Sequence, residues 1–165
     1  MKSIFLIGFM GAGKTTVGKA LGEEMNLPVL DTDEEIVKQE NRSINEIFAK
    51  EGEGYFRQVE SQILKDLPKE KMIITTGGGI ILQGENRAYL QTNGTVIYLH
   101  AKIEELLFRL QNDQTRPLVR NGDKQEIIER YQKRLALYEQ TCHIQIQTEG
   151  KSVAEIVTEI NECLK

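Results

Sequence analysis

Short apolar runs recur along the chain, and the longer stretches between them repeat apolar residues at helical spacing. Apolar runs rich in β-branched residues predict buried strands, and the helical spacing predicts amphipathic helices. The predicted strands cover residues 4–7, 29–30, 72–75, 95–99 and 143–146. Regular alternation of this kind predicts parallel strands joined by right-handed crossovers. We therefore expect an α/β fold, a three-layer α/β/α sandwich around a five-stranded parallel sheet, in one domain over residues 1–165.

The first predicted strand leads into Gly8-Phe9-Met10-Gly11-Ala12-Gly13-Lys14-Thr15, which matches the phosphate-loop pattern G-x-x-x-x-G-K-[ST]. Glycines let the backbone curl so that several N–H groups point into one hollow, and the following helix adds the positive end of its dipole. Lys14 would bridge the outer phosphates, and the Thr15 hydroxyl would hold a magnesium ion. The alternative is a glycine-rich turn without a ligand, but the strand before the motif and the helix after it favour a phosphate loop.

Acidic residues follow the second predicted strand directly, as Asp31-Thr32-Asp33. Ligands of parallel α/β sheets bind beyond the carboxyl ends of the strands, so these carboxylates face the same crevice as the phosphate loop. One carboxylate could organise magnesium through water, and the other could accept a proton from an attacking hydroxyl. The alternative is structural, with Thr32 or Asp33 capping a helix that begins at Glu34.

A capping box at Ser43-Ile44-Asn45-Glu46 predicts a helix start, and the helix should break at Gly52 or Gly54. Arg57 and Glu60 follow at a spacing of three and can pair on one helix face. From the sequence alone, we expect this pair to be solvated.

Three successive glycines, Gly77-Gly78-Gly79, follow the strand at residues 72–75. Glycine has no side chain, so a ligand can approach the backbone closely. A simple turn rarely needs three glycines, and we favour a loop that faces a ligand.

Polarity rises sharply after the apolar helix stripe that ends at Leu110. Residues 111–123 contain Arg116-Pro117 and Asn121-Gly122-Asp123, which predict a mobile loop. In a phosphoryl-transfer enzyme such a loop would be a lid that excludes water and brings an arginine to the phosphates. The next helix carries Tyr138 in its apolar stripe and Arg134 beside it, and a basic residue there could reach an anionic substrate.

Composition limits the remaining classes. A chain of 165 residues with 39% hydrophobic and 28% charged residues is ordinary for a globular domain. The net charge of −4 argues against a protein whose main role is to bind nucleic acid. Cys142 and Cys163 have neither metal-binding nor redox spacing, and no apolar stretch approaches the length of a membrane span. We expect a cytoplasmic protein.

Taken together, the motifs resemble those of the shikimate kinases, small members of the nucleoside-monophosphate-kinase-like group of P-loop proteins. The resemblance spans essentially the whole chain. It depends on Gly8 to Thr16, Asp31-Thr32-Asp33, Phe56-Arg57-Gln58-Val59-Glu60, Gly77-Gly78-Gly79, Arg116-Pro117-Leu118 and Arg134-Leu135-Ala136-Leu137-Tyr138. It implies transfer of the γ-phosphoryl group of ATP to the 3-hydroxyl of shikimate, giving shikimate 3-phosphate and ADP on the route to aromatic amino acids.

The resemblance also implies residue roles. Asp33, Lys14 and Arg116 would be catalytic, with Asp33 as the general base. Shikimate would bind to Asp33, Arg57, Glu60, Gly78, Gly79 and Arg134, within a segment over about 33–61 and under a lid over about 111–123. ATP would bind to Gly11, Ala12, Gly13, Lys14, Thr15, Thr16, Arg109 and Arg116. One Mg²⁺ would be held by Thr15 and Asp31.

Expected partners are therefore ATP and shikimate, with no nucleic acid and no membrane, and the family is commonly monomeric. Two other functions stay open at this point. One is another small-metabolite kinase of the same group, such as a gluconate kinase. The other is a protein that binds ATP for an interaction and transfers nothing.

Overall fold

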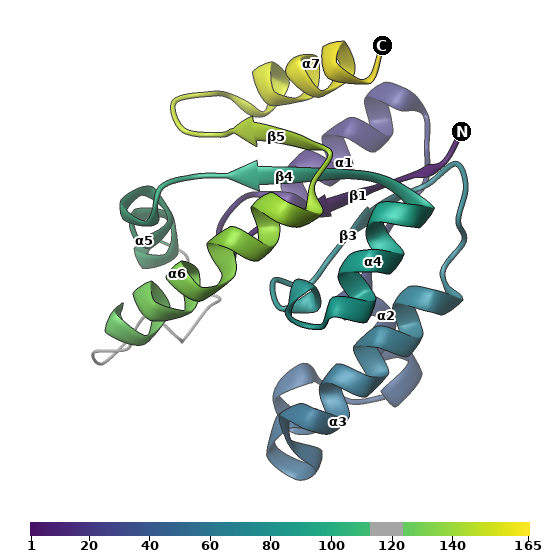
Figure 1. Ribbon diagram of the computed structural model, residues 1–165, viewed down its shortest axis with the longest axis vertical. Helices are drawn as coiled ribbons and strands as arrows, with labels where there is room; N and C mark the ends of the chain where they lie inside the picture. Colours follow the sequence, from purple (N-terminus) through teal and green to yellow (C-terminus); the bar gives the residue numbers. More distant parts are fainter. Residues whose placement is uncertain (113–123) are drawn as a thin grey trace.

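The computed structural model describes residues 1–112 and 124–165. Its centre is a single five-stranded sheet in the order β2-β3-β1-β4-β5, and every neighbouring pair of strands is parallel (Figure 1). The strands are β1 (Ser3–Ile7), β2 (Val29–Asp31), β3 (Ile73–Thr75), β4 (Gly94–His100) and β5 (Ile144–Gln147). The predicted fold class is thus confirmed, and each predicted strand agrees with the observed one to within one residue at either end.

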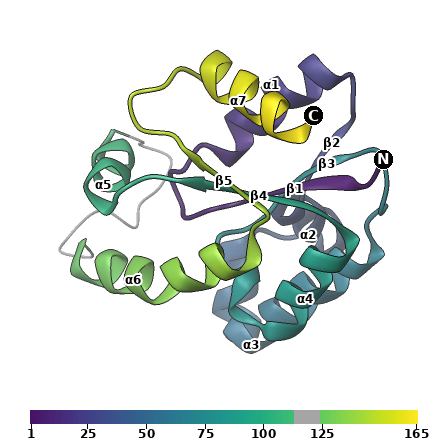
Figure 2. The same cartoon turned by 45° about the horizontal axis from the view of Figure 1, so that its top comes forward.

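Helices cover both faces of the sheet, as all-parallel sheets require. Figure 2 shows α1 and α7 on one face and α3, α4 and α6 on the other. The helices are α1 (Lys14–Met25), α2 (Thr32–Glu40), α3 (Ile44–Asp66), α4 (Gly84–Asn93), α5 (Ile103–Gln111), α6 (Lys124–Thr141) and α7 (Val153–Leu164), with a short 3₁₀ turn η1 (Ile80–Leu82). Within the described part of the chain, no helix is both long and apolar enough to cross a membrane.

Two hydrophobic clusters stabilise these layers. The larger one is built on β1, β3 and β4, whose apolar side chains are buried on both faces of the sheet. The smaller one joins α2 to α3 and consists of Ile36, Ile47, Phe56, Val59 and Ile63. Because the second cluster is separate from the first, α2 and α3 form a packed pair at one end of the molecule.

Helix α3 begins as the sequence predicts. The Ser43 hydroxyl accepts the N–H of Glu46, and the Glu46 carboxylate accepts the N–H of Ser43, so the capping box is complete. The predicted break is a kink at Gly52, where φ is 84° and ψ is 172°. Beyond this kink the helix carries Arg57 and Glu60 toward the sheet.

The carboxyl ends of all five strands lie along one edge of the sheet, because the strands are parallel. β1 ends at the phosphate loop, β2 at Asp31, and β3 just before the three glycines. This topology brings motifs that are far apart in sequence to one edge, where the candidate site lies.

Candidate active site

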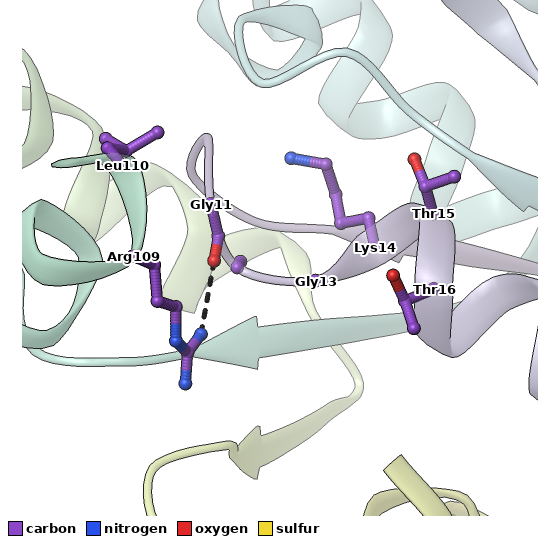
Figure 3. Close-up of a pocket in the computed structure, with 8 residues that line it drawn as sticks. Gly11, Gly13, Lys14, Thr15, Thr16, Arg109 and Leu110 are labelled. Atoms are coloured by element: carbon purple, nitrogen blue, oxygen red, sulfur yellow. Dashed lines mark hydrogen bonds between the residues drawn. The ribbon is translucent and has the colours of Figure 1, made fainter. Parts of the chain in front are cut away.

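The phosphate loop forms one half of the site. Gly13 is the N-cap of α1 and has φ of 95°, a left-handed conformation that favours glycine. Residues Gly11 to Thr16, together with Arg109 and Leu110 of α5, line a cavity of about 240 Å³ (Figure 3). A hollow at a helix N-terminus, lined by backbone N–H groups and a lysine, suits an anion such as a phosphate.

Lys14 extends its side chain back across this loop. Its Nζ donates to the carbonyl oxygens of Gly8, at 2.5 Å, and of Phe9, at 3.2 Å. The ammonium group is therefore held over the loop, next to the hollow that Thr15 and Thr16 border (Figure 3).

Arg109 closes the far side of the hollow. Its Nη1 donates to the carbonyl of Gly11 at 3.2 Å, its Nη2 donates to the Thr148 hydroxyl at 3.2 Å, and its Nε donates to Glu105 at 3.1 Å. Arg109, Thr148 and Lys151 also border an adjoining cavity of about 260 Å³. The two cavities share Arg109 and residues of the loop in their linings, so together they offer more room beside the arginine than a phosphate group needs.

Asp31, the first of the two acidic residues, ends β2 and has structural partners. Asp31 accepts the N–H of Glu34 at 3.1 Å and the Thr75 hydroxyl at 2.7 Å, which ties the end of β2 to the end of β3. Asp31 is thus the N-cap of α2, and the prediction that Thr32 or Asp33 caps a helix starting at Glu34 is wrong. The helix begins two residues earlier because Asp31 adopts the extended backbone conformation of a cap.

The three glycines make room for functional side chains. A Cβ atom at Gly77 would lie 2.8 Å from Oδ1 of Asp33 and 3.1 Å from Oε2 of Glu60. A Cβ atom at Gly79 would lie 2.5 Å from both Nη atoms of Arg57. The contacts of 2.8 Å and 2.5 Å are shorter than real side chains make, so a side chain at Gly77 or Gly79 would have to displace the Asp33 carboxylate or the Arg57 guanidinium.

The middle glycine faces a fourth charged group. A Cβ atom at Gly78 would lie 3.5 Å from Nη1 of Arg134, 3.6 Å from the Tyr138 hydroxyl and 3.7 Å from the carbonyl oxygen of Gly8. The turn therefore brings side chains from α2, α3 and α6 to one place, and that place adjoins the phosphate loop.

Arg57 and Glu60 form a buried ion pair rather than the solvated pair that the sequence predicts. Their Nη1 and Oε1 atoms are 2.9 Å apart, and the Glu60 side chain is only 1% exposed. Sequence spacing places the two residues on one helix face but does not say that α3 turns this face toward the glycine turn. Burial raises the pKa of Glu60 to about 7, and the nearby Arg57 guanidinium partly opposes this shift.

Tyr138 is a residue of the site whose role the sequence does not reveal. Its hydroxyl donates to the carbonyl of Gly78 at 2.5 Å, and it also lies beside Arg134. Burial lowers the pKa of Arg134, because the charged guanidinium is partly removed from water. The helical period correctly places Tyr138 among buried residues, but it cannot show that the hydroxyl points to a turn 60 residues away.

Few residues here could hold a metal. Residues 1–112 and 124–165 contain no group of three or more His, Cys, Asp and Glu side chains arranged to bind one. Mg²⁺ bound with a nucleotide takes most of its ligands from water and phosphate oxygens and needs only one or two protein groups. The Thr15 hydroxyl and the Asp31 carboxylate fit that requirement. Arg116, and with it most of the predicted lid over residues 111–123, lies outside the described residues.

A phosphate loop at the edge of an all-parallel sheet, beside a cluster of two carboxylates and two arginines, defines a P-loop kinase that acts on a small anionic molecule. Comparison with known proteins makes the assignment specific. A family model described as shikimate kinase matches residues 10–165. The chain belongs to the shikimate kinase family, as the sequence motifs predict.

Individual relatives cover the whole chain. It is 47% identical to a shikimate kinase of Bacillus cereus (strain G9842), over 98% of both chains, and 44% identical to one of Enterococcus faecalis (strain ATCC 700802 / V583), over 100% of this chain and 99% of the relative. Among solved structures, it resembles a shikimate kinase from Acinetobacter baumannii in complex with shikimate, with a TM-score of 0.91 and 36% identity over 99% of this chain and 93% of that one. The predicted function, ATP-dependent phosphorylation of shikimate, is confirmed at the level of the family.

Substitution of Gly79 tests the steric account of the turn. Gly79→Ala should displace the Arg57 guanidinium, which is the flexible end of a long side chain, and leave the fold intact. We expect the KM for shikimate to rise at least about tenfold, the loss of one charge-assisted contact, with the KM for ATP unchanged within about twofold. Steady-state kinetics with each substrate varied in turn measures both values.

Gly54→Ala is the control. Among the described residues, no atom lies within 4 Å of a Cβ at Gly54 other than those of its chain neighbours and its own helix. Wild-type kinetics in both variants would contradict the account.

The buried Glu60 carboxyl predicts how stability depends on pH. Its pKa is about 7 in the folded protein, above the ordinary value of 4.5, so the folded state retains a proton that the unfolded chain releases between these values. The contribution of Glu60 to stability should therefore fall as the pH rises from about 5 to 8. Relative to Glu60→Gln, the wild-type protein should lose roughly 1–3 kcal/mol of unfolding free energy over that range.

Urea unfolding of both proteins at several pH values measures the difference. Glu34→Gln removes an exposed carboxylate of α2 and serves as the control. The difference in unfolding free energy between this variant and the wild type should change little with pH. A wild-type advantage over Glu60→Gln that grows with pH would show that Arg57 outweighs burial, contrary to this prediction.

Proposed function

We propose that the chain transfers the γ-phosphoryl group of ATP to the 3-hydroxyl of shikimate with the residues at this sheet edge. One observation carries the proposal: Asp33, Arg57, Glu60 and Arg134 surround a glycine turn whose middle residue adjoins Gly8, and Lys14 donates to the carbonyl of Gly8. An acceptor held by the charged cluster would therefore lie next to a phosphate held by the loop. Such proximity converts the transfer into an intramolecular step.

The nucleotide is assigned to the loop. Backbone N–H groups of Gly11, Ala12 and Gly13 would receive the phosphates, and the Thr16 hydroxyl lies at the same N-terminus of α1. Arg109 would contact the adenine, because it borders the adjoining cavity and its planar guanidinium can stack on a base.

The acceptor is assigned to the glycine turn and to residues 33–61. Arg57 and Arg134 would bind the carboxylate of shikimate, since two guanidinium groups can orient one planar anion. Glu60 would hold Arg57, as its 2.9 Å ion pair supports. The N–H groups of Gly78 and Gly79 make no hydrogen bond to other described residues, so they are available to the substrate.

Asp33 would act as the general base. It would accept the proton of the 3-hydroxyl as the hydroxyl oxygen attacks the γ-phosphorus of ATP. The new bond joins that oxygen to the γ-phosphorus, and the bond between the γ-phosphorus and the oxygen that bridges it to the β-phosphate breaks, releasing ADP. Lys14 and Arg116 would stabilise the negative charge on the transferring group. Bound with ATP, Mg²⁺ would be held directly by Thr15 and through water by Asp31, and would neutralise phosphate charge.

Three further expectations stay predictions: a monomer, a cytoplasmic location, and binding of neither nucleic acid nor membrane. Closure of a lid over residues 111–123 is likewise a proposal.

Asp33→Asn tests the base. The amide keeps the size of the side chain but cannot accept the proton, so kcat should fall about 10²–10⁴-fold while ATP binding changes little. ADP release with and without shikimate measures turnover, and titration with ATP measures binding. Glu34→Gln, on the next residue of α2, should behave as wild type. Unchanged turnover in Asp33→Asn would refute the role of Asp33.

Gluconate tests the alternative acceptor. The wild-type protein should release no ADP when gluconate replaces shikimate.

Arg57→Ala tests the carboxylate site. We expect the KM for shikimate to rise at least about tenfold and the KM for ATP to stay within about twofold. Lys50→Ala removes an exposed positive charge from the same helix and should change neither. Shikimate methyl ester lacks the negative charge and should be a poor substrate of the wild type. Its KM should rise little further in Arg57→Ala, because the contact that the substitution removes is already lost. Equal increases in both KM values would argue against the assignment.

A further inference from the structure

We infer that Tyr138 is a positioning residue for the acceptor, which holds the glycine turn in place beside Arg134 and so sets the geometry in which the turn meets the acceptor. The inference extends the proposed function, since it depends on shikimate binding at this turn. It assigns to one buried hydroxyl a role in substrate affinity, distinct from its part in core packing.

The hydroxyl controls the direction of one peptide group. It donates to the carbonyl of Gly78 at 2.5 Å, a short and direct contact between α6 and the turn after β3. In a trans peptide the C=O and the following N–H point in opposite directions. By holding the carbonyl of Gly78, Tyr138 therefore aims the N–H of Gly79 away from α6. Glycine peptides rotate readily because no Cβ restricts them, so this turn has particular need of such an anchor.

Arg134 lies on the same side of the turn. A Cβ atom at Gly78 would lie 3.5 Å from Nη1 of Arg134 and 3.6 Å from the Tyr138 hydroxyl. Burial raises the pKa of Tyr138, and the positive charge of Arg134 only partly opposes this shift, so the phenol stays neutral and can donate to Gly78. Arg134 is further restrained by Phe9 of the phosphate loop, whose ring centre lies 6.0 Å from its Cζ atom.

The ring of Tyr138 is fixed independently of its hydroxyl. The side chain is 1% exposed and stacks on Tyr98 of β4, with ring centres 5.0 Å apart and an angle of 24° between the rings. Because these contacts involve the ring alone, Tyr138→Phe should keep the packing and remove only the hydrogen bond to the carbonyl of Gly78. The substitution therefore separates the packing role from the positioning role.

Tyr131 offers a matched control on the same helix. It is also buried, and its hydroxyl donates to a backbone carbonyl, that of Ala101, at 2.9 Å. Its ring contacts Phe9 edge-on, with centres 5.4 Å apart, a contact that Tyr131→Phe would retain. The two variants thus each lose one buried hydroxyl bonded to a carbonyl, but only Tyr138 bonds the glycine turn.

The experiment compares the steady-state kinetics of wild type, Tyr138→Phe and Tyr131→Phe, with shikimate and ATP varied in turn. In Tyr138→Phe we expect the KM for shikimate to rise about fivefold to tenfold, the loss of one buried hydrogen bond, and the KM for ATP to stay within about twofold. In Tyr131→Phe the KM for shikimate should not change. Equal KM values for shikimate in the two variants would overturn the inference.

A second measurement does not depend on the overall stability of either variant. The increase in melting temperature that shikimate produces is compared with the increase that ADP produces, within each variant. Tyr138→Phe should lose much of the first and keep the second, and loss of both or of neither would count against positioning. A wild-type enzyme that releases no ADP with shikimate would instead refute the proposed function, so the two failures are distinguishable.

Discussion

The site depends on a steric constraint: at Gly77 and Gly79 the backbone must have no side chains. Three elements direct charged groups at this turn, and the Asp33 carboxylate and the Arg57 guanidinium occupy space that a Cβ atom at these two positions would need. The glycines thus contribute by leaving space for the neighbouring charged side chains. A larger residue at Gly77 or Gly79 would displace Asp33, Glu60 or Arg57, and the cluster would lose the arrangement in which all of them face one small volume.

Crowding of this kind has an electrostatic cost, which the cluster partly balances. Two carboxylates and two guanidinium groups share the turn, so the net charge of Asp33, Glu60, Arg57 and Arg134 is zero when all four are ionised. Burial acts against this, since it raises the pKa of Glu60 and lowers that of Arg134. Because the raised pKa leaves the Glu60 carboxyl partly protonated near neutral pH, the two arginines are not fully balanced by the two acidic residues. The carboxylate of a bound anionic acceptor would supply the missing negative charge.

The two halves of the site meet where the backbone of Gly8 approaches Gly78 and where the ring of Phe9 lies against Arg134. Gly8 accepts from Lys14 and adjoins Gly78, while Phe9 lies beside Arg134. The phosphate loop is therefore in contact with the charged cluster around the glycine turn. Rigid elements place both halves, because the loop ends β1 and the turn ends β3, and these two strands pair directly. Such support favours the close and constant spacing that phosphoryl transfer needs.

The sequence by itself determined the architecture and the motifs. Apolar runs separated by amphipathic stretches specify parallel strands and covering helices, and parallel strands bring their carboxyl ends to one edge whatever the details of packing. Local patterns were equally reliable where the interaction is local, as in the phosphate loop and the capping box at Ser43.

Only the tertiary structure decided which groups are buried and where they point. It placed Glu60 out of water, made Asp31 the cap of α2, and directed the hydroxyl of Tyr138 to Gly78. Periodicity gives the face on which a residue lies but not the element that this face meets. Burial and long-range hydrogen bonds arise from the packing of α2, α3 and α6 around the end of β3, and therefore exist only once the chain has folded.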